Sequence, residues 1–303
     1  MIYTVTLNPA LDYVMQVKNL QFDDINRSHF EDLHYGGKGI NVSVILTRLG
    51  IPNKALGFIA GFTGERLNEL LISEGINCSF LRLENGATRI NVKIKSDTEL
   101  DINARGPEIH ESDVERLIDS MRNIKEGDYL VLAGSIPENL PSNIYERILC
   151  SLDGKGIKVI VDATGDLLKN VLKYKPFLIK PNHHELGDLF GVKVQNDEDI
   201  VKYANKLREM GAGNVLVSRG AKGATLVDEN GEVTSIGIVE GKIVNTVGSG
   251  DSMVAGFLAG FIETGDYKYA LRLGAAAGNA TAFCEALAEA VNIKSAFEKL
   301  KIN

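Results

Sequence analysis

Residues 241–265 constrain the fold more than any other part of the chain. Their sequence, GKIVNTVGSGDSMVAGFLAGFIETG, predicts a strand, a glycine turn and then a helix that is apolar on nearly every side. A helix of this kind is buried, because it has no polar face to turn toward water. Gly248 and Gly250 allow a tight turn and let another group approach the backbone closely. The stretch therefore predicts a buried helix whose N-terminus lies at a site.

The N-terminus of this helix is suited to an anion. The N–H groups of Ser249, Gly250 and Asp251 have no acceptor within the helix, and the helix dipole favours negative charge there. The Asp251 carboxylate could take a proton from a hydroxyl while backbone donors stabilise the moving charge. The alternative interpretation is that Asp251 only caps the helix, a position where Asp is common.

Composition excludes some classes of partner. The chain has 303 residues, which fits one large α/β domain or two domains. Its net charge of −7 and pI of about 5.4 argue against nucleic acid as a partner. An acidic protein that binds an anionic ligand must gather its positive charge locally.

The cysteines and the N-terminus indicate the compartment. Cys78, Cys150 and Cys284 are scattered without metal-ligand spacing, which is typical of a reducing compartment. The first residues lack the basic leader of a signal peptide and are interrupted at Pro9. No apolar run reaches the ~18 residues that a membrane span needs. We expect a cytoplasmic protein with no membrane partner.

Strand and helix patterns alternate after residue 112, which predicts right-handed crossovers and a parallel sheet. Ser112 and Glu115 have the spacing of a capping box that opens a helix to Met121. We predict one α/β domain over residues 1–303. Two irregular, polar β stretches, at about 10–35 and 86–106, are predicted to form a lid inserted into it.

Five predicted strand ends carry glycine or polar residues. A parallel sheet brings such ends to one edge, where they form one long cleft. Phosphoryl transfer needs positioning, charge neutralisation and one base, and this set offers all of them. The five ends are residues 8–12, 36–41, 134–137, 180–185 and 248–251.

Three of these features also have simpler interpretations. The glycines around Lys38 suit an anionic ligand but are not a Walker A loop, and they could be a flexible turn. Asn182 and Glu185 have capping-box spacing, although at a strand end they could also orient hydrated Mg²⁺. Residues 88–93 alternate strictly, so the polar side chains of Arg89 and Asn91 share one face. That face could hold a phosphorylated ligand or be solvated.

Taken together, these motifs resemble the ribokinase/PfkB family of sugar kinases over essentially the whole chain. Residues 36–41 are similar to the N-terminal signature of the family and residues 245–252 to its C-terminal one. Lys180-Pro181-Asn182-x-x-Glu185 is similar to its metal and phosphate motif. The resemblance implies a ribokinase-like three-layer α/β fold, with a central, mostly parallel sheet flanked by helices and a small β-sheet lid.

The resemblance also implies roles on the sugar side of the cleft. Asp251 would be the base, and the N–H groups of Gly248, Ser249 and Gly250 would form an anion hole for the transferring phosphoryl group. The remaining residues would bind the sugar phosphate. Asp12, Gly37 and Asn41 would hold sugar hydroxyls, and Lys38 and Arg89 would hold the phosphate, together with Ser135 and Arg27 of the lid. Asn91, on the same strand face as Arg89, is also expected to bind the substrate.

On the nucleotide side, the resemblance implies ATP and Mg²⁺ as cofactors. Lys180, Asn182 and Glu185 would order the metal and the nucleotide phosphates, with Glu185 contacting Mg²⁺ through water. In this family the lid often pairs with the lid of a second subunit, so a homodimer is expected. The ATP site would be lined by Ser218, Arg219, Gly220, Ala221, Lys222, Gly223 and Asn279.

Residues 4–12 and Thr88-Arg89 are most similar to the branch that acts on phosphorylated hexoses. The implied reaction is ATP-dependent phosphorylation of a phosphorylated ketohexose, first D-fructose 1-phosphate to fructose 1,6-bisphosphate. Tagatose 6-phosphate, fructose 6-phosphate or an unphosphorylated sugar are alternatives. The last is disfavoured, because contacts from Lys38 and Arg89 to phosphate, roughly 1.5–3 kcal/mol each, would be unused.

The sequence disfavours two other function classes. A nicotinamide oxidoreductase needs G-x-G-x-x-G after the first strand, where Asn8-Pro9-Ala10 stands instead. A non-catalytic sugar-phosphate sensor would have no use for a base at Asp251. One departure from the family is Tyr35 before the glycine pair, where a small residue is expected, and it predicts a differently shaped sugar end.

Overall fold

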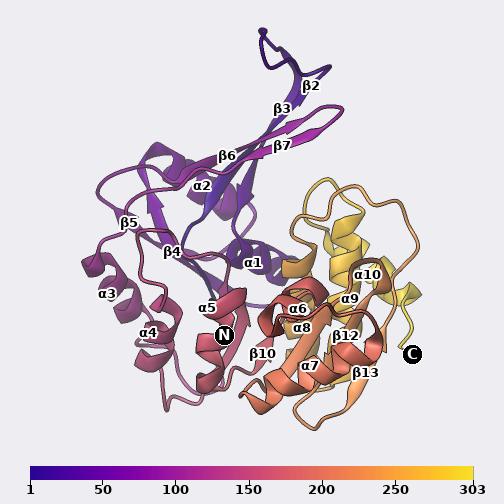
Figure 1. Cartoon of the computed structure of the whole chain (residues 1–303). Helices are drawn as coiled ribbons and strands as arrows, with labels where there is room; N and C mark the ends of the chain where they lie inside the picture. The colour runs from indigo at the N-terminus through magenta and orange to yellow at the C-terminus, as the bar shows by residue number, and fades with distance from the viewer. Residues whose placement is uncertain (303) are drawn as a thin grey trace.

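The computed structural model describes residues 1–302 and contains two sheets (Figure 1). The strands of the large sheet are β1 (Ile2–Thr6), β4 (Asn53–Ala60), β5 (Cys78–Leu83), β8 (Tyr129–Ala133), β9 (Lys158–Asp162), β10 (Leu178–Ile179), β11 (Asn214–Ser218), β12 (Ala224–Val227) and β13 (Val233–Ile236). Their order is β13-β12-β11-β10-β9-β8-β1-β4-β5. The pairs β11–β12 and β12–β13 are antiparallel, and all other neighbouring strands of this sheet pair in parallel, which confirms the mostly parallel sheet.

Helices cover both faces of this sheet, which confirms the three-layer α/β fold. On one face α3 to α7 pack on the strands, and on the other α1, α8, α9 and α10 do so. Helix α2 packs beside β4 against α1. The bounds are α1 Lys38–Arg48, α2 Gly61–Ser73, α3 Glu111–Ser120, α4 Ile144–Ser151, α5 Gly165–Val171, α6 His183–Phe190, α7 Asp197–Glu209, α8 Ser249–Thr264, α9 Tyr267–Ala282 and α10 Ala290–Lys299.

The second sheet projects from the large one, at the top of Figure 1. Its strands are β2 (Ala10–Val17), β3 (Ser28–Gly36), β6 (Arg89–Lys95) and β7 (Glu99–Ile102), in the order β3-β2-β6-β7. We call these four strands the lid. Asp12 pairs in register with His34 and with Asn91, so these polar side chains share one face. Tyr13, Leu33 and Val92 share the other, apolar face.

Helix α8 forms as the sequence predicts. Every residue from Asp251 to Gly260 is buried, and α9 packs along it. A Cβ on Gly256 would lie 2.6 Å from the Leu273 carbonyl oxygen, so only glycine permits this approach of the two helices. Although α8 is apolar, no helix in the described part of the chain is both long and apolar enough to cross a membrane.

Two local predictions are wrong. Helix α3 begins at Glu111, one residue before the predicted cap at Ser112. Its first turn is closed by Asp113, whose Oδ2 accepts the His110 N–H at 3.1 Å, so Glu115 is not the partner of the cap. Gly61 and Gly64 predict a turn before a helix that starts at Glu65, but residues 61–64 are already the first turn of α2.

Residues 243–247 are not the predicted strand. Their apolar side chains are exposed, and the N–H groups of Val244 and Asn245 both donate to the Ala282 carbonyl oxygen instead of a neighbouring strand. Apolar and β-branched residues favour a strand only where a sheet edge is available for pairing. The turn at Gly248 is therefore reached from an irregular segment that packs on the end of α9.

Candidate active site

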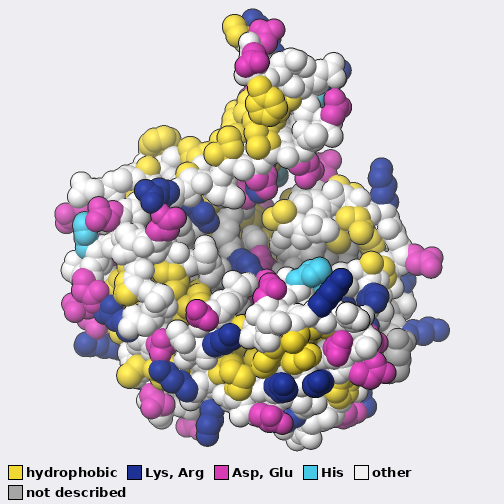
Figure 2. All heavy atoms as spheres, in the orientation of Figure 1, with side chains coloured by type: hydrophobic (Ala, Val, Ile, Leu, Met, Phe, Trp, Pro, Cys, Tyr) yellow, Lys and Arg dark blue, Asp and Glu magenta, His cyan; other side chains and the backbone are white. Residues whose placement is uncertain are grey.

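A cavity of about 990 Å³ lies below the lid, where the predicted strand ends meet. Figure 2 shows the hollow between the two halves of the molecule, with charged side chains inside it. Four strand ends and the N-terminus of α8 contribute to its wall, as the sequence predicts. The predicted site residues that line it are Asp12, Gly37, Lys38, Asn41, Arg89, Ser135, Lys180, Gly248, Gly250 and Asp251.

Asp251 lies at the bottom of this cavity, in the first turn of α8. The residue is 5% exposed, and its Oδ2 accepts a hydrogen bond of 2.8 Å from Asn41 Nδ2. Burial raises the pKa of Asp251 to about 6, and the negative charge of Asp162 adds to this effect. The charges of Lys38 and Lys180 and the Asn41 hydrogen bond oppose it. The carboxylate is thus basic but still ionised at neutral pH.

The turn before α8 differs in one respect from the prediction. Gly248 adopts a left-handed φ of 79° at the N-cap, which favours glycine. The Ser249 N–H donates to the Thr246 carbonyl oxygen at 3.2 Å, so the expectation that it is free is wrong. It closes the turn that brings the chain into the helix. Within residues 1–302 no acceptor is found for the N–H groups of Gly250 and Asp251.

Two lysines and one aspartate form a charged cluster beside this turn. Asp162 ends β9, and its oxygens lie 3.2 Å from Lys38 Nζ and 3.4 Å from Lys180 Nζ. A Cβ on Gly250 would lie 3.1 Å from Lys180 Nζ, so this ammonium group faces the helix N-terminus. The cluster concentrates positive charge where the acidic chain needs it for an anion.

The pKa values in this cluster depend on mutual attraction. Burial opposes the charge of Asp162, but Lys180 and Lys38 outweigh it and hold the pKa of Asp162 below its ordinary value. Burial likewise opposes the charge of Lys38, but Asp162, Asp251 and Glu185 hold the pKa of Lys38 above its ordinary value. Asp162 and Lys38 therefore both stay charged at neutral pH.

Sequence reasoning missed Asp162. It follows the buried strand VIV, and a polar residue at the carboxyl end of a parallel strand was the available signal. Ala163 and Thr164, the two residues that follow it, carry no glycine motif that would mark this strand end.

The lid supplies the opposite wall of the cavity. Asp12 Oδ1 accepts a hydrogen bond of 2.8 Å from Asn91 Nδ2, and a Cβ on Gly36 would lie 2.8 Å from the same oxygen. Arg89 lines the cavity and contacts the Ala104 carbonyl oxygen at 3.4 Å. Burial lowers the pKa of Arg89, and Asp12 opposes this shift. Asp12, Asn91 and Arg89 thus lie together, as their strand positions predict.

Arg27 is not brought to the cavity. It is exposed in the loop between β2 and β3, at the tip of the lid, and does not line the cavity. Tyr35 turns toward Arg48, with its hydroxyl 3.4 Å from Arg48 Nη2. Since Leu11 and not Asp12 is its partner in register, Tyr35 lies on the opposite strand face from Asp12.

The motif at residues 180–185 forms the predicted capping box. Asn182 Oδ1 accepts the N–H groups of His184 and Glu185, both at 2.8 Å, and Glu185 Oε2 accepts the Asn182 N–H at 2.7 Å. Asn182 also forms an isolated parallel bridge with Ser218. This pairing places the end of β11 directly beside the motif.

The residues predicted for ATP are Ser218 of that bridge, residues 219–223 directly after it, and Asn279 in α9. Residues 220–222 form a 3₁₀ turn after Arg219, and Arg219 Nη1 pairs with Asp197 at 2.7 Å. Gly223 has a φ of 84°, and a Cβ there would lie 2.0 Å from the Ile236 carbonyl oxygen. The Asn279 side chain accepts the Val239 N–H at 3.0 Å and donates to the Ala275 carbonyl oxygen at 2.8 Å.

The sequence predicts one acidic residue, Glu185, as a contact of Mg²⁺ through water. Within residues 1–302 no group of three His, Cys, Asp or Glu side chains is placed to hold a metal ion. Mg²⁺ is usually held by one or two carboxylates, several waters and substrate phosphates. The negative charge of Glu185 contributes to the raised pKa of Lys38, which lines the cavity.

Comparison with known proteins agrees with this geometry. A model described as pfkB family carbohydrate kinase matches residues 6–293. The 1-phosphofructokinase of Bacillus subtilis (strain 168) is 43% identical over 302 residues, covering 100% of this chain and 99% of that protein. The D-tagatose-1-phosphate kinase of Bacillus licheniformis is 37% identical over 304 residues, covering 100% and 99%.

A solved structure shows the same fold. The phosphofructokinase-2 of Escherichia coli, in complex with substrates and products, is similar with a TM-score of 0.93 and 28% identity, and the match covers 98% of both chains. The family expected from the sequence motifs is therefore confirmed. Because the family match spans nearly the whole chain, the protein belongs to the pfkB family of carbohydrate kinases.

Proposed function

We propose that the protein transfers the γ-phosphoryl group of ATP to a ketohexose phosphate, with D-fructose 1-phosphate as substrate and fructose 1,6-bisphosphate as product. One observation carries this proposal. The ionisable Asp251 carboxylate and the free N–H groups at the N-terminus of α8 share a cavity with Lys38 and Arg89. The identity to the Bacillus subtilis 1-phosphofructokinase supports the choice of sugar.

In the proposed reaction Asp251 accepts the proton of the acceptor hydroxyl. The hydroxyl oxygen then forms a bond to the γ-phosphorus, and the bond from that phosphorus to the bridging oxygen of ADP breaks. A base with a pKa of about 6 is ionised at pH 7 and still basic enough to help. Asn41 orients the carboxylate by its hydrogen bond to Oδ2.

The N-terminus of α8 stabilises the charge on the transferring group. We assign this anion hole to the turn of Gly248 and Gly250, with the N–H of Asp251 in addition, because the Ser249 N–H is already used. The ammonium group of Lys180 lies beside Gly250 and adds positive charge. Asn182 and Glu185 would hold Mg²⁺ through water, and the ion would neutralise part of the charge on the nucleotide phosphates.

The phosphate already on the sugar needs a second positive region. Arg89 and Lys38 line the same cavity from the lid and from α1, and we propose that they hold this phosphate near Ser135. Asp12 and Gly37 line the cavity with them, and Asn91 donates a hydrogen bond to Asp12. We propose that this group contacts the sugar hydroxyls. The identity to a D-tagatose-1-phosphate kinase favours D-tagatose 1-phosphate as a second candidate.

For ATP, we propose the surface formed by residues 218–223 and the end of α9. Its support is the bridge between Asn182 and Ser218, which joins this surface to the phosphate motif. We assign Asn279 an indirect role, because its amide is already engaged with Val239 and Ala275.

We further propose that the whole chain is one catalytic unit and that it acts in the cytoplasm as a homodimer joined by its lids. The apolar face of the lid supports the dimer, because Ile90 and Ile102 are 39% and 53% exposed there. Figure 2 shows apolar side chains gathered on the projecting sheet. Arg27, exposed at the lid tip, would then lie near the partner.

The test is ADP release with Mg²⁺ and a panel of sugars. The panel contains D-fructose 1-phosphate, D-tagatose 1-phosphate, D-tagatose 6-phosphate, D-fructose 6-phosphate and unphosphorylated D-fructose. We expect the largest kcat/KM for D-fructose 1-phosphate. Asp251→Asn should bind sugar phosphate and ATP but lose roughly 10²–10⁴-fold in kcat. If kcat/KM for D-fructose equals that for D-fructose 1-phosphate, the lid does not bind a phosphate. If Asp251→Asn keeps full activity, Asp251 is not the base.

A further inference from the structure

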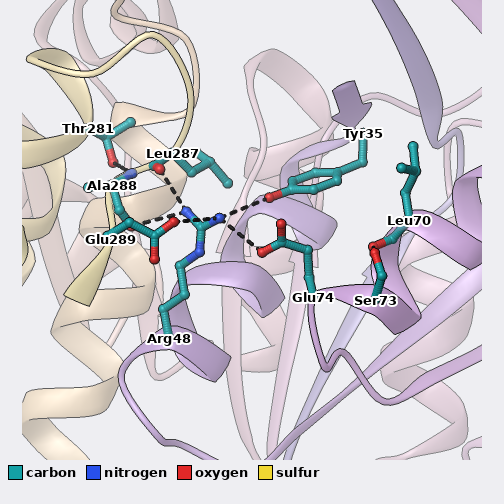
Figure 3. Close-up of polar contacts among 9 residues, drawn as sticks. All are labelled: Tyr35, Arg48, Leu70, Ser73, Glu74, Thr281, Leu287, Ala288 and Glu289. Atoms are coloured by element: carbon teal, nitrogen blue, oxygen red, sulfur yellow. Dashed lines mark hydrogen bonds and ion pairs between the residues drawn. The ribbon is translucent and has the colours of Figure 1, made fainter. Parts of the chain in front are cut away.

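The cavity continues past Asp251 to a second group of polar contacts, centred on Arg48 at the end of α1 (Figure 3). The Arg48 side chain is only 13% exposed. Its Nη1 donates to the carbonyl oxygens of Leu287 at 2.7 Å and Ala288 at 3.2 Å. These residues belong to the irregular segment 283–289 between α9 and α10. The reaction proposed above leaves Arg48 without a role.

The main partners of Arg48 are the two carbonyl groups. Its Nη2 also contacts Glu74 at 3.0 Å and Glu289 at 3.1 Å, but these side chains are 37% and 62% exposed. Ion pairs to exposed carboxylates contribute little to stability. The two carbonyls, in contrast, lie in an irregular segment, and a buried carbonyl needs a donor. Arg48 thus holds the backbone of this segment in place.

The segment that Arg48 holds packs against the start of α8. A Cβ built on Gly248 would lie 2.5 Å from Leu287 Cδ2 and 3.6 Å from Asn41 Nδ2, so the leucine side chain rests directly on the N-cap. Leu287 also packs on the hydrophobic cluster that contains Ile40 and Val44 of α1. A shift of Leu287 would change the space into which the turn at Gly248 fits.

We propose that Arg48 is a positioning residue for phosphoryl transfer. By holding the Leu287 and Ala288 carbonyls, it keeps the Leu287 side chain against Gly248 and so fixes the direction of the N–H groups that follow. The inference rests on the proposed function of those groups as the anion hole. Its route is indirect, because Arg48 reaches the reacting atoms only through the leucine.

A second set of hydrogen bonds, made by Thr281, also holds segment 283–289 and agrees with this role. The Ala288 N–H donates to Thr281 Oγ1 at 3.2 Å, and Thr281 Oγ1 lies 2.8 Å from Ser252 Oγ in the first turn of α8. The segment is therefore attached to α1 by Arg48 and to α8 and α9 by Thr281. Both attachments meet at the helix turn that carries Asp251.

The first test is the kinetics of Arg48→Met. We expect kcat for the sugar phosphate to fall by about 10- to 100-fold, as for a small displacement of catalytic groups. The KM values for sugar phosphate and ATP should change by less than about threefold, because Arg48 is not among the residues proposed to bind either substrate. A KM increase with unchanged kcat would contradict a role in the anion hole.

Arg272→Met is the matched control. Arg272 also holds a backbone carbonyl, that of Phe297, through Nε at 3.1 Å and Nη2 at 2.8 Å, but it joins α9 to α10 outside the cavity. We expect it to lower the thermal unfolding temperature and leave kcat unchanged. An equal loss of kcat in both variants would show that Arg48 only stabilises the fold and does not position the anion hole.

A binding measurement separates positioning from turnover. Aluminium fluoride with MgADP mimics the transferring phosphoryl group, so it should tighten MgADP binding to the wild-type protein in the presence of the sugar phosphate. In Arg48→Met this gain should be lost, while the affinity for MgADP alone is kept. A full gain in the variant would overturn the proposal.

The route through Leu287 is tested by a double-mutant cycle. Leu287→Ala should lower kcat as Arg48→Met does, and the double variant should be no worse than either, because both remove one contact. Additive losses of kcat in the double variant would overturn this route. If Arg48→Met does not fold, the loss of kcat in Leu287→Ala alone tests the contact with Gly248. Failure of the proposed function is distinct, since the wild-type protein would then phosphorylate none of the sugar phosphates.

Discussion

Asn41 Nδ2 donates a hydrogen bond of 2.8 Å to Asp251 Oδ2, and this contact joins the first turn of α1 to the first turn of α8. The two residues are 210 positions apart in the sequence. Lys38 lies one turn before Asn41, on the same face of α1. One helix therefore brings a cation to the cavity and also orients the carboxylate proposed as the base.

The burial of Asp251 is expected to cost stability. Its pKa rises from 3.8 to about 6 in the folded protein, so the ionised form is disfavoured by folding. Asp251→Asn should therefore unfold at higher urea concentration than wild type. Above pH 6 its free energy of unfolding should be larger by up to ~3 kcal/mol. Below about pH 3 Asp251 is mostly protonated in the folded and in the unfolded protein, so the difference should disappear. Urea unfolding between pH 3 and pH 8 measures it, and a gain independent of pH would contradict a raised pKa.

The charge of Asp162 should appear in the pH profile of the reaction. Because this charge raises the pKa of Asp251, Asp162→Asn should move the acidic limb of kcat toward lower pH. The variant also frees Lys38 and Lys180, so kcat itself is expected to change. Asp128→Asn is the control, since Asp128 is a buried carboxylate paired with the N-terminus at the other end of the sheet. An acidic limb that stays in place in Asp162→Asn would argue that the two carboxylates are not coupled.

Arg89 is expected to act on the sugar phosphate alone. Arg89→Ala removes a cation from the lid wall of the cavity, and a charged contact to phosphate corresponds to a roughly 10- to 100-fold increase in KM for the sugar phosphate. The KM for ATP should stay near that of wild type. Arg82→Ala, which breaks an exposed pair with Glu65, should change neither value. Equal increases for both substrates would place Arg89 in the wrong half of the cavity.

The lid face offers a test of the proposed dimer. A glutamate at the exposed positions of the apolar face, in Ile90→Glu with Ile102→Glu, should convert the protein to monomers in analytical ultracentrifugation. Val291→Glu is the matched control, because Val291 is 73% exposed on α10, away from the lid. If the wild-type protein sediments as a monomer, or the lid variant as a dimer, the lid is not the interface.

The sheet, the lid and the position of the cleft could be predicted because they depend on local patterns. The helix that begins near residue 249 is apolar on nearly every side and had to be buried, and the alternation at residues 88–93 assigned Arg89 and Asn91 to one face. The polar strand ends had to meet, because parallel strands end at one edge. The prediction of a strand at residues 243–247 is wrong because a strand depends on a partner elsewhere in the chain. The N–H groups of Val244 and Asn245 donate to the Ala282 carbonyl oxygen and not to a neighbouring strand.

The sequence by itself determined that a buried helix with an acidic, glycine-rich N-terminus must face a basic crevice, because residue spacing and backbone freedom are local properties. Only the tertiary structure decided which groups share that crevice. It placed Asp162 between Lys38 and Lys180, gave the Ser249 N–H to Thr246, and left Arg27 at the lid tip. Charge coupling and hydrogen bonding depend on distances between segments far apart in the chain, and those distances are fixed only when the whole sheet has formed.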